Sequence, residues 1–337
     1  MQFPRRTPAT LLTTGVIVVA LAGCGSTDTA APTEASGAPL TEEQLNGLEV
    51  TFVPGVTADS FYISMQCGMQ EVADEYGITI ANQDPAQYDV TVQTPIVNAV
   101  AQTQTSALLV APTDPVALTP ALQKVADAGI PIGLVDSTIE DTSLAFTEVR
   151  TDNEAAGATA ADALAELIGG SGKVLAIAFK TGAGPSDERQ RGFEERITSE
   201  HPDIELLESQ DSNNDPAKAA SIVSAALAAN PDLKGIFATN QFAAQGASTG
   251  IRNAGKEGDV KVVGFDAGPT QVEQLERGDV QALVAQQPKA IGEQVIEQLV
   301  GQLTGGEVES SILVGAEVVT AENLDEMGDV LYKESCD

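Results

Sequence analysis

The chain has 337 residues, 42% of them hydrophobic, which is enough for two domains with buried cores. It carries 49 Asp and Glu against 17 Lys and Arg, and this net charge of −32 excludes nucleic-acid binding, which depends on basic side chains at the phosphates. The single histidine, His201, argues against zinc sites built on several imidazoles and against most Ser-His-Asp arrangements.

The first 23 residues have the pattern of a secretion signal. Arg5 and Arg6 precede an apolar run over 11–22 that is too short to cross a bilayer. The run ends in Leu21-Ala-Gly-Cys24, which resembles a bacterial lipobox, and we therefore expect Cys24 to be lipidated and to become the new N-terminus. An ordinary secretory signal with a chance cysteine is the alternative.

Residues 24–46 are rich in Ser, Thr, Ala, Pro, Gly and acids, a composition that predicts a flexible tether. We expect an exported protein, anchored to the outer face of the cytoplasmic membrane through its N-terminal lipid only. Outside the cytoplasm the two other cysteines, Cys67 and Cys336, can form a disulfide; the alternative is a pair of buried free thiols.

After the tether, short β-branched runs alternate with amphipathic stretches of helical length. Strands are predicted at 49–54, 79–82, 107–111, 132–135, 146–150, 173–178, 204–209, 235–238, 260–265 and 280–285, and helices include 61–76, 116–128, 153–168, 216–229 and 289–303. Repeated βα units indicate parallel sheets with helices on both faces. The fold class is therefore α/β, with two doubly wound sheets.

Ligands of open α/β sheets bind beyond the carboxyl ends of the strands, so the residues that follow each strand are the candidates for a site. They are polar and aromatic, without an obvious nucleophile and base: Thr57 to Tyr62, Pro112 to Asp114, Asp136-Ser137, Asn240-Gln241, Asp266 and Gln286-Gln287. This pattern predicts a hydrogen-bonding pocket.

Several motifs for other functions are present only in part. Gly246-Ala-Ser248-Thr-Gly250 matches a nucleophile elbow, but Ser248 falls within a helical pattern over 242–254, which makes an exported serine hydrolase an unfavoured alternative. The calcium-like run 211–215 is followed by Pro216 where such a loop needs glycine, and the glycine-rich segments match no nucleotide-binding motif. We expect no metal, no cofactor and no enzyme activity.

The order of these elements and the residues after the strands resemble the ribose-binding-protein type of bacterial solute-binding protein, the extracytoplasmic receptors of sugar ABC importers. The pieces that carry the resemblance are Ser60-Phe61-Tyr62, Pro112-Thr113-Asp114, Thr151-Asp152-Asn153, Arg189 with Arg191-Gly192-Phe193, Phe237-Ala-Thr-Asn240, Val263-Gly-Phe-Asp266, and Ala285-Gln286-Gln-Pro288 followed by Ile291-Gly292.

The resemblance implies a sugar site with aromatic faces and polar edges. Phe61 and Tyr62 match positions that sandwich the sugar ring, and the matching polar positions are Asp136, Arg189, Asn240, Asp266 and Gln286. The chain departs from ribose receptors at Asp59, Ser137 and Asn214, where they carry asparagine, a second arginine and a third aromatic residue. A pentose other than ribose, a hexose and a linear polyol remain open as the small neutral ligand.

The alternatives are a receptor for a non-sugar solute, such as a furanone-type signal or a nucleoside, and a transcription regulator of the related fold. The regulator would need a basic DNA-binding headpiece, which residues 1–46 do not provide.

The same resemblance implies the organisation of the chain. One lobe comprises 47–151 and 287–316, the other 152–286 and 317–337, with three crossovers as a hinge, and we expect a monomer that delivers its ligand to an ABC importer permease. The tail after 320 is longer than the fold needs. Its residues Leu324, Met327, Val330, Leu331 and Tyr332 are spaced for a short amphipathic helix that packs back on the lobe with Cys67, which predicts a Cys67–Cys336 disulfide.

Overall fold

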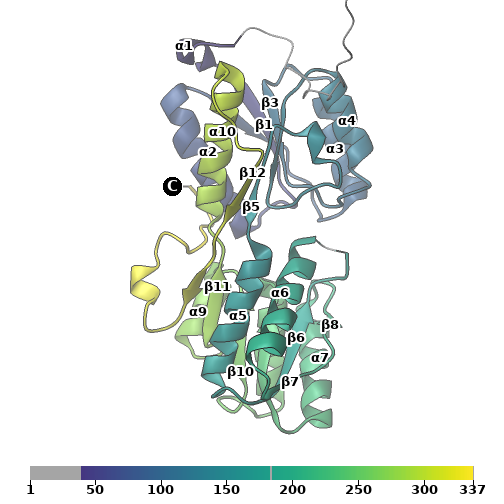
Figure 1. The fold of residues 1–337 in the computed structure, drawn as a ribbon, viewed down its shortest axis with the longest axis vertical. Helices are drawn as coiled ribbons and strands as arrows, with labels where there is room; N and C mark the ends of the chain where they lie inside the picture. Colours follow the sequence, from purple (N-terminus) through teal and green to yellow (C-terminus); the bar gives the residue numbers. More distant parts are fainter. Residues whose placement is uncertain (1–38, 183, 337) are drawn as a thin grey trace, which may run out of the picture. The chain divides into compact units, whose positions relative to one another are not determined.

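The computed structural model describes residues 39–182 and 184–336, which form two α/β lobes (Figure 1). Each lobe contains a mostly parallel sheet, with helices against it, so the predicted fold class is confirmed. The predicted signal peptide, Cys24 and most of the predicted tether lie outside the described residues.

The N-terminal lobe is built on a six-stranded parallel sheet in the order β12-β5-β4-β3-β1-β2. Its strands are β1 (Glu49–Val53), β2 (Thr79–Asn82), β3 (Ala107–Val110), β4 (Ile132–Val135), β5 (Thr147–Thr151) and β12 (Ser311–Val314). Its helices are α1 (Glu42–Leu45), α2 (Ser60–Tyr76), α3 (Val90–Val100), α4 (Thr119–Asp127) and α10 (Pro288–Thr304), with a 3-10 turn, η1 (Thr142–Leu144).

Both faces of this sheet are buried, because alternate side chains of a strand point to opposite faces. In β3, Leu108 belongs to the core cluster that contains Leu122 of α4, whereas its neighbour Leu109 belongs to the cluster that contains Met65 of α2 and Val295 of α10. The near-continuous apolar run of this strand is therefore a consequence of its place in the centre of the sheet.

The C-terminal lobe has a seven-stranded sheet in the order β13-β11-β10-β9-β6-β7, with β8 paired to β6. Its strands are β6 (Gly172–Ala178), β7 (Ile204–Leu206), β8 (Gln210–Asp211), β9 (Leu233–Ala238), β10 (Lys261–Phe265), β11 (Ala282–Ala285) and β13 (Glu317–Val319), of which β13 is antiparallel to β11. Its helices are α5 (Asn153–Leu167), α6 (Gly184–Glu200), α7 (Pro216–Ala229), α8 (Gln241–Asn253) and α9 (Pro269–Glu276).

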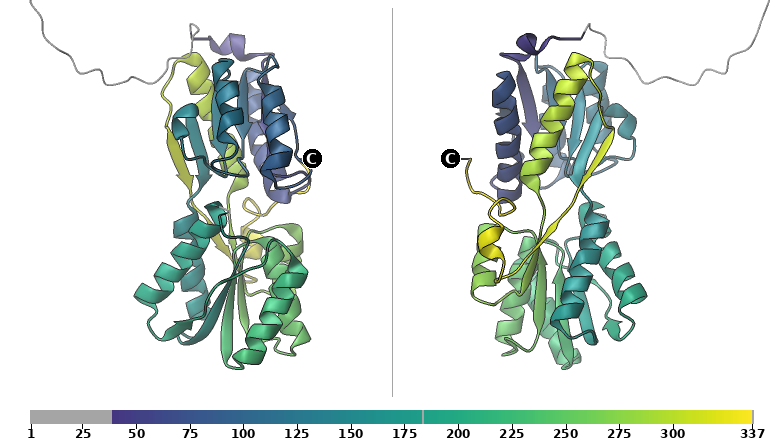
Figure 2. Two further views of the ribbon diagram at one scale, coloured as in Figure 1. Left: turned by 90° about the vertical axis from the view of Figure 1, so that its right-hand side faces the viewer. Right: turned by 60° about the vertical axis from the view of Figure 1, so that its left-hand side comes forward.

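The chain passes between the two sheets at three places: after β5 into α5, after β11 into α10, and from β12 to β13 (Figure 2). These connections are one or two residues long, at residue 152, at 286–287 and at 315–316. Each connection directly follows the carboxyl end of a strand, namely β5, β11 or β12. Positions after strand ends are also the ones from which the sequence predicts a binding site.

Each lobe contains helices that pack closely through glycine. A Cβ atom at Gly68 of α2 would lie 2.1 Å from the Lys289 carbonyl oxygen, and one at Gly292 of α10 would lie 2.0 Å from the Met65 carbonyl oxygen. The pair α5 and α6 of the C-terminal lobe makes the same kind of contact at Gly157 and Gly192. Only glycine allows two helix backbones to approach so closely.

The predicted boundary of the tether at residue 46 is wrong. Leu45 is fully buried at the end of α1, and the Leu40 N–H donates to the Leu303 carbonyl at 2.9 Å. The last residues of the predicted tether therefore belong to the N-terminal lobe, because two leucines in an otherwise polar segment reach its apolar surface.

The tail forms what we call the C-terminal strap, residues 320–336. The amphipathic helix predicted there is wrong: the strap contains a single 3-10 turn, η2 (Leu324–Glu326), and is otherwise irregular. It runs from the C-terminal lobe back to α2, where Cys336 is bonded to Cys67 with the two Cα atoms 5.2 Å apart (Figure 2, right).

Candidate functional site

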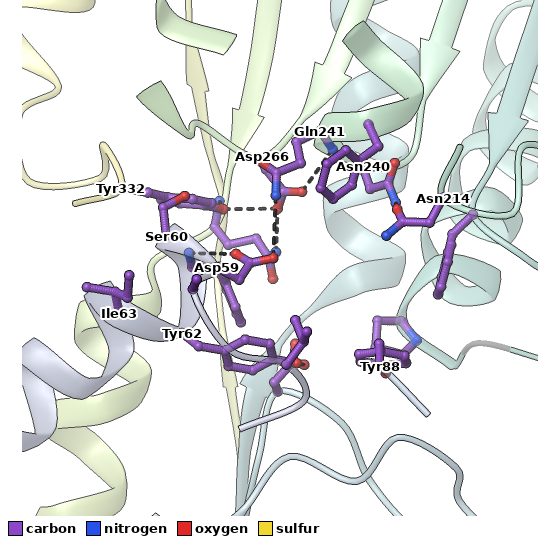
Figure 3. A pocket seen from close by; sticks show the side chains of 18 of the residues that line it. Asp59, Ser60, Tyr62, Ile63, Tyr88, Asn214, Asn240, Gln241, Asp266 and Tyr332 are labelled. Atoms are coloured by element: carbon purple, nitrogen blue, oxygen red, sulfur yellow. Dashed lines mark hydrogen bonds between the residues drawn. The ribbon is translucent and has the colours of Figure 1, made fainter. Parts of the chain in front are cut away.

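A cavity of about 800 Å³ lies between the lobes, at the carboxyl ends of their strands (Figure 3). Residues of both lobes line it, among them nine of the ten positions predicted from the sequence: Asp59, Phe61, Tyr62, Asp136, Arg189, Asn214, Asn240, Asp266 and Gln286. The volume falls in the range of sites for small organic ligands.

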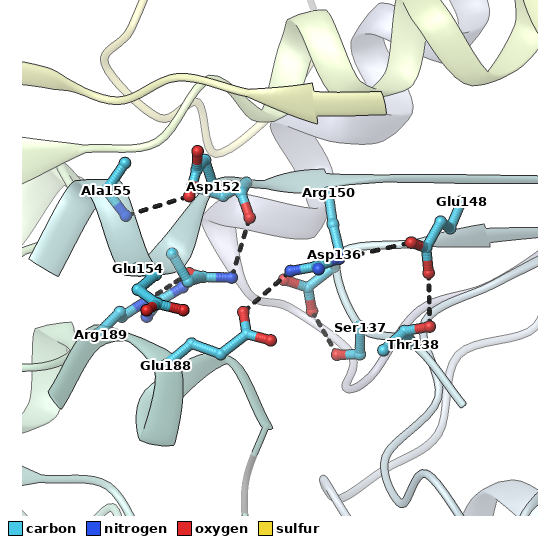
Figure 4. Close-up of polar contacts among 12 residues, drawn as sticks. Asp136, Ser137, Thr138, Glu148, Arg150, Asp152, Glu154, Ala155, Glu188 and Arg189 are labelled. Atoms are coloured by element: carbon cyan, nitrogen blue, oxygen red, sulfur yellow. Dashed lines mark hydrogen bonds and ion pairs between the residues drawn. The ribbon is translucent and has the colours of Figure 1, made fainter. Parts of the chain in front are cut away.

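The tenth position, Ser137, does not line this cavity in the structure. It is buried behind Asp136, and its hydroxyl donates to Asp136 Oδ2 at 3.2 Å (Figure 4). Its place suits a supporting residue that orients the Asp136 carboxylate rather than one that contacts the ligand.

The aromatic wall of the N-terminal lobe is formed at the start of α2. Asp59 caps this helix by accepting a hydrogen bond from the Phe61 N–H at 2.9 Å, which fixes the direction in which Phe61 and Tyr62 enter the cavity. Their rings meet edge to face with centroids 5.2 Å apart. Because the two rings are in contact with each other, a sugar ring does not fit between them, and a sandwich would need an opposing face from other residues.

Asp136 and Asp266 occupy equivalent places in the two lobes, each directly after a central strand. Both have left-handed backbones, with φ of 63° and 76°. The Asp136 N–H still donates to Val149 O at 3.0 Å and the Asp266 N–H to Val284 O at 2.9 Å, so each strand pairs to its last residue and then turns sharply. Aspartate tolerates this conformation better than most residues, and the turn places each carboxyl group at the cavity.

The Asp136 carboxylate is held by its neighbours in the N-terminal lobe. The Tyr62 hydroxyl donates to Asp136 Oδ2 at 2.7 Å. Burial raises the pKa of Asp136, and burial followed by the negative charge of Asp136 raises the pKa of Tyr62 well above its ordinary value. Tyr62 is therefore a stable hydrogen-bond donor at all physiological pH values.

Asp266 belongs to a second network, in the C-terminal lobe. Gln286, which follows β11, donates from Nε2 to Asp266 Oδ1 at 2.7 Å and accepts at Oε1 from the Thr151 hydroxyl at 2.6 Å. The Tyr332 hydroxyl donates to the same Asp266 Oδ1 at 3.1 Å. The carboxylate is thus oriented by two donors before any ligand arrives.

Arg189 supplies a fixed set of donors from α6. It is 6% exposed, and its guanidinium lies 3.8 Å from the centroid of the Phe265 ring. Nε donates to Asn153 Oδ1 at 2.8 Å and Nη1 to Thr239 O at 3.0 Å. Because a guanidinium carries five N–H groups, three remain for neighbouring hydroxyl groups of a ligand.

The position of Arg189 depends on the close contact of α5 and α6. A Cβ atom at Gly157 would lie 2.1 Å from the Arg189 carbonyl oxygen, and one at Gly192 would lie 2.0 Å from the Glu154 carbonyl oxygen. This approach brings Asn153, at the start of α5, within hydrogen-bond distance of the Arg189 side chain.

Asn240 and Asn214 form a polar pair at the far side of the cavity. Asn240 caps α8 by accepting from the Ala243 N–H at 2.9 Å, and its Nδ2 donates to Asn214 Oδ1 at 2.7 Å. Asn214 also lines the cavity, so its amide nitrogen can serve as a donor there (Figure 3).

The lining residues that were not predicted include the aromatic residues Tyr88, Phe179 and Tyr332. Tyr88 and Phe179 come from different lobes and meet edge to face, with centroids 5.9 Å apart. Phe179 directly follows β6, so it could have been predicted from the tendency of ligands to bind beyond the carboxyl ends of parallel strands. Tyr332 lies in the C-terminal strap, where no strand end or motif marks it.

The charges that line the cavity are mainly negative. Asp59, Asp136 and Asp266 face it, and among its described lining residues Arg189 is the only base. Burial, with a further contribution from the charges of Asp266 and Asp136, raises the pKa of Asp59 to about 6 against the lowering effect of the Phe61 N–H. Asp59 therefore changes its charge near pH 6 instead of near pH 4.

An ion pair crosses between the lobes beside the cavity (Figure 4). Arg150, near the end of β5, donates from Nη1 to Glu188 Oε2 of α6 at 2.9 Å, and both side chains are largely buried. The two lobes are thus in contact at this edge of the cavity.

The geometry gives no support to a serine hydrolase. Ser248 lies inside α8, is 4% exposed, and donates to the Ala244 carbonyl at 3.0 Å. His201, the single histidine, is half-buried and pairs with Asp162 Oδ1 at 2.8 Å. Both side chains are occupied by structural hydrogen bonds.

Across residues 39–182 and 184–336, no group of acidic, histidine or cysteine side chains is arranged to hold a metal ion. No helix within those residues is long and apolar enough to cross a membrane.

Comparison with known proteins agrees with this geometry. The profile of a family described as "Periplasmic binding protein domain" matches residues 50–307. The ribose import binding protein of Bacillus subtilis is 30% identical over 252 residues, which are 75% of this chain and 80% of that protein. The D-allose-binding periplasmic protein of Escherichia coli is 27% identical over 81% of this chain and 90% of its own length.

Solved structures give the same result. A solute-binding protein of an ABC transporter from Agrobacterium vitis, with bound α-D-tagatopyranose, has a TM-score of 0.81 and 35% identity, covering 85% of this chain and 99% of its own. A second one from the same organism, with bound D-fucose, has a TM-score of 0.77 and 32% identity, covering 84% of this chain and all of its own.

Proposed function

Because this chain belongs to the periplasmic binding protein family, we propose that it is an extracytoplasmic receptor that captures one monosaccharide or sugar alcohol between its lobes and delivers it to an ABC importer. Relatives that import ribose and allose, and similar structures with bound tagatose and D-fucose, support a sugar as the ligand.

The observation that carries the proposal is the composition of the cavity. Oriented carboxylates, an arginine fork and amide groups from both lobes surround it, together with aromatic rings. Sugars have polar edges and apolar C–H faces, and each carboxylate or amide can bind two neighbouring hydroxyl groups. Binding needs no chemical step, since closure around the ligand is enough for a permease to distinguish a loaded receptor from an empty one.

The ligand contacts in this proposal come from both lobes. In the N-terminal lobe they are Asp59, Phe61, Tyr62 and Asp136, with Ser137 as support; in the C-terminal lobe they are Arg189, Asn214, Asn240, Asp266 and Gln286. We further propose that the receptor is a monomeric lipoprotein held at the membrane by the lipid on Cys24. The sequence around Cys24 supports this anchor.

A thermal-shift screen tests the function. A ligand that binds only the folded state raises the apparent stability, by about 2.7 kcal/mol when its concentration is 100 times the Kd. We expect at least one pentose, hexose or polyol to raise the melting temperature, with calorimetry giving a stoichiometry of one. If nucleosides or furanones stabilise the protein and none of the sugars does, the sugar assignment is wrong.

A further inference from the structure

The C-terminal strap contacts both lobes within five residues. The Tyr332 N–H donates to the Ala267 carbonyl of the C-terminal lobe at 3.1 Å. The next residue, Lys333, donates its N–H to the Ser64 hydroxyl of α2 at 2.7 Å, and Cys336 is bonded to Cys67 of the same helix. The strap therefore crosses from one lobe to the other beside the cavity.

Tyr332 enters the cavity from this strap (Figure 3). Its side chain is 6% exposed, and its ring packs against the Phe61 ring with centroids 5.8 Å apart. Its hydroxyl accepts from the Gln286 N–H at 3.2 Å while donating to Asp266 Oδ1. One side chain of the tail thus joins the aromatic wall of one lobe to the polar network of the other.

The hydroxyl of Tyr332 decides which oxygen of Asp266 is free. Oδ1 already receives hydrogen bonds from Tyr332 and Gln286, whereas Oδ2 receives only a long one, from the Gln241 N–H at 3.3 Å. Burial raises the pKa of Tyr332 well above its ordinary value, so the hydroxyl stays a donor. Oδ2 is therefore the oxygen that Asp266 offers to a ligand.

The strap also bounds one end of the cavity. Tyr332 and Glu334 line it, and Tyr332 lies beside Ser60, at the start of α2, on the side of the cavity away from Tyr88 and Asn214 (Figure 3). A ligand longer than one sugar ring would meet the strap at this end.

We propose that Tyr332 is a specificity-determining residue of the site, which orients Asp266 and closes one end of the cavity so that the receptor accepts a single sugar unit. The inference rests on the proposed function and goes beyond it, because Tyr332 lies outside the segment 50–307 that matches the family.

The disulfide keeps Tyr332 at this place. Tyr332 lies four positions before Cys336, and a separation of four positions spans at most about 14 Å in an extended chain. While Cys336 is bonded to α2, Tyr332 therefore cannot move far from the mouth of the cavity. After reduction the covalent tie to α2 is lost, and only non-covalent contacts such as the hydrogen bonds to Ala267 and Asp266 keep Tyr332 in the cavity.

The experiment measures affinities of the protein for the monosaccharide found in the thermal-shift screen and for disaccharides that contain it. Tyr332→Phe should bind the monosaccharide about tenfold more weakly, because it loses a hydrogen bond to a charged group. Tyr332→Ala and Cys336→Ser should also lower the preference for the monosaccharide over the disaccharide at least about tenfold, and reduced wild-type protein should behave like Cys336→Ser. Tyr76→Phe, at the other end of α2, is the matched control and should match the wild type.

Circular dichroism checks that each variant is folded. If Tyr332→Ala does not fold, the conservative variant Tyr332→Phe still decides the test. A wild-type preference retained in Tyr332→Ala, or an unchanged affinity in Tyr332→Phe, would overturn the inference and leave the sugar function standing. A wild-type protein that binds no sugar would instead overturn the proposed function, and this inference with it.

Discussion

Replacing Asp59 with asparagine is expected to stabilise the ligand-free protein at neutral pH. Asparagine is as good a helix cap as aspartate, so the hydrogen bond to the Phe61 N–H that starts α2 is kept. What the substitution removes is a negative charge that is half-buried and lies near two other carboxylates.

The pKa of Asp59 sets the size and the sign of the effect. Burial first, and then the charges of Asp266 and Asp136, raise it from 3.8 to about 6. The folded protein therefore binds this proton more tightly than the unfolded chain, and the stability that results is present below about pH 4 and is lost as the pH rises through about 6. A difference of roughly two pKa units corresponds to at most about 3 kcal/mol at neutral pH.

Urea unfolding without ligand measures this effect. At about pH 7.5, Asp59→Asn should be about 1–3 kcal/mol more stable than the wild type, and at about pH 4 the two should be nearly equal. Asp89→Asn is the control, because Asp89 caps α3 in the same way but is exposed and has a lowered pKa. A gain of the same size at both pH values, or none at about pH 7.5, would refute the electrostatic reasoning.

Three further outcomes are expected. Asp266→Ala should weaken sugar binding by about 2–5 kcal/mol, since Gln286 loses its buried partner, and an unchanged affinity in calorimetry would remove Asp266 from the site. Gly192→Ala should destabilise the protein by about 1–3 kcal/mol in urea unfolding, because the added Cβ meets the backbone of α5. Gly184→Ala is the control and should leave the stability unchanged, since the space around Gly184 is open. Equal stabilities of the two variants would contradict the contact. Cys24→Ser should release the protein from membranes in fractionated cells, and continued retention would disprove the lipid anchor.

The fold class could be predicted from the sequence because the central strands, which are buried on both faces, consist almost entirely of apolar residues. The four residues of β3, Ala107–Val110, are all fully buried, and such an apolar run is the signature of a strand covered on both faces. Elements with a weaker pattern were not predicted. Helix α6 is mostly polar and presents no clear apolar stripe, and α3 contains Pro95, which usually marks a helix end.

The site was predictable to the extent that it lies at strand ends. Asp136, Asp266 and Gln286 follow parallel strands directly, and the topology alone brings such positions together. Tyr332 was not predictable as a site residue, because its place depends on the path of an irregular strap. The apolar spacing around it indicated a helix, but hydrogen bonds to Ala267 and Asp266 fix an irregular backbone instead.

The glycine contacts of the helix pairs have a consequence for motion. Where backbone meets backbone, no side chain can change its rotamer to let the helices slide, so each lobe is expected to move as a rigid body. Any rotation of one lobe against the other then falls on the five connecting residues between the sheets. One of these is Gln286, which we propose as a ligand contact. A bound sugar would therefore contact a residue of the hinge. Opening the lobes would change the position of one of the groups that bind the sugar.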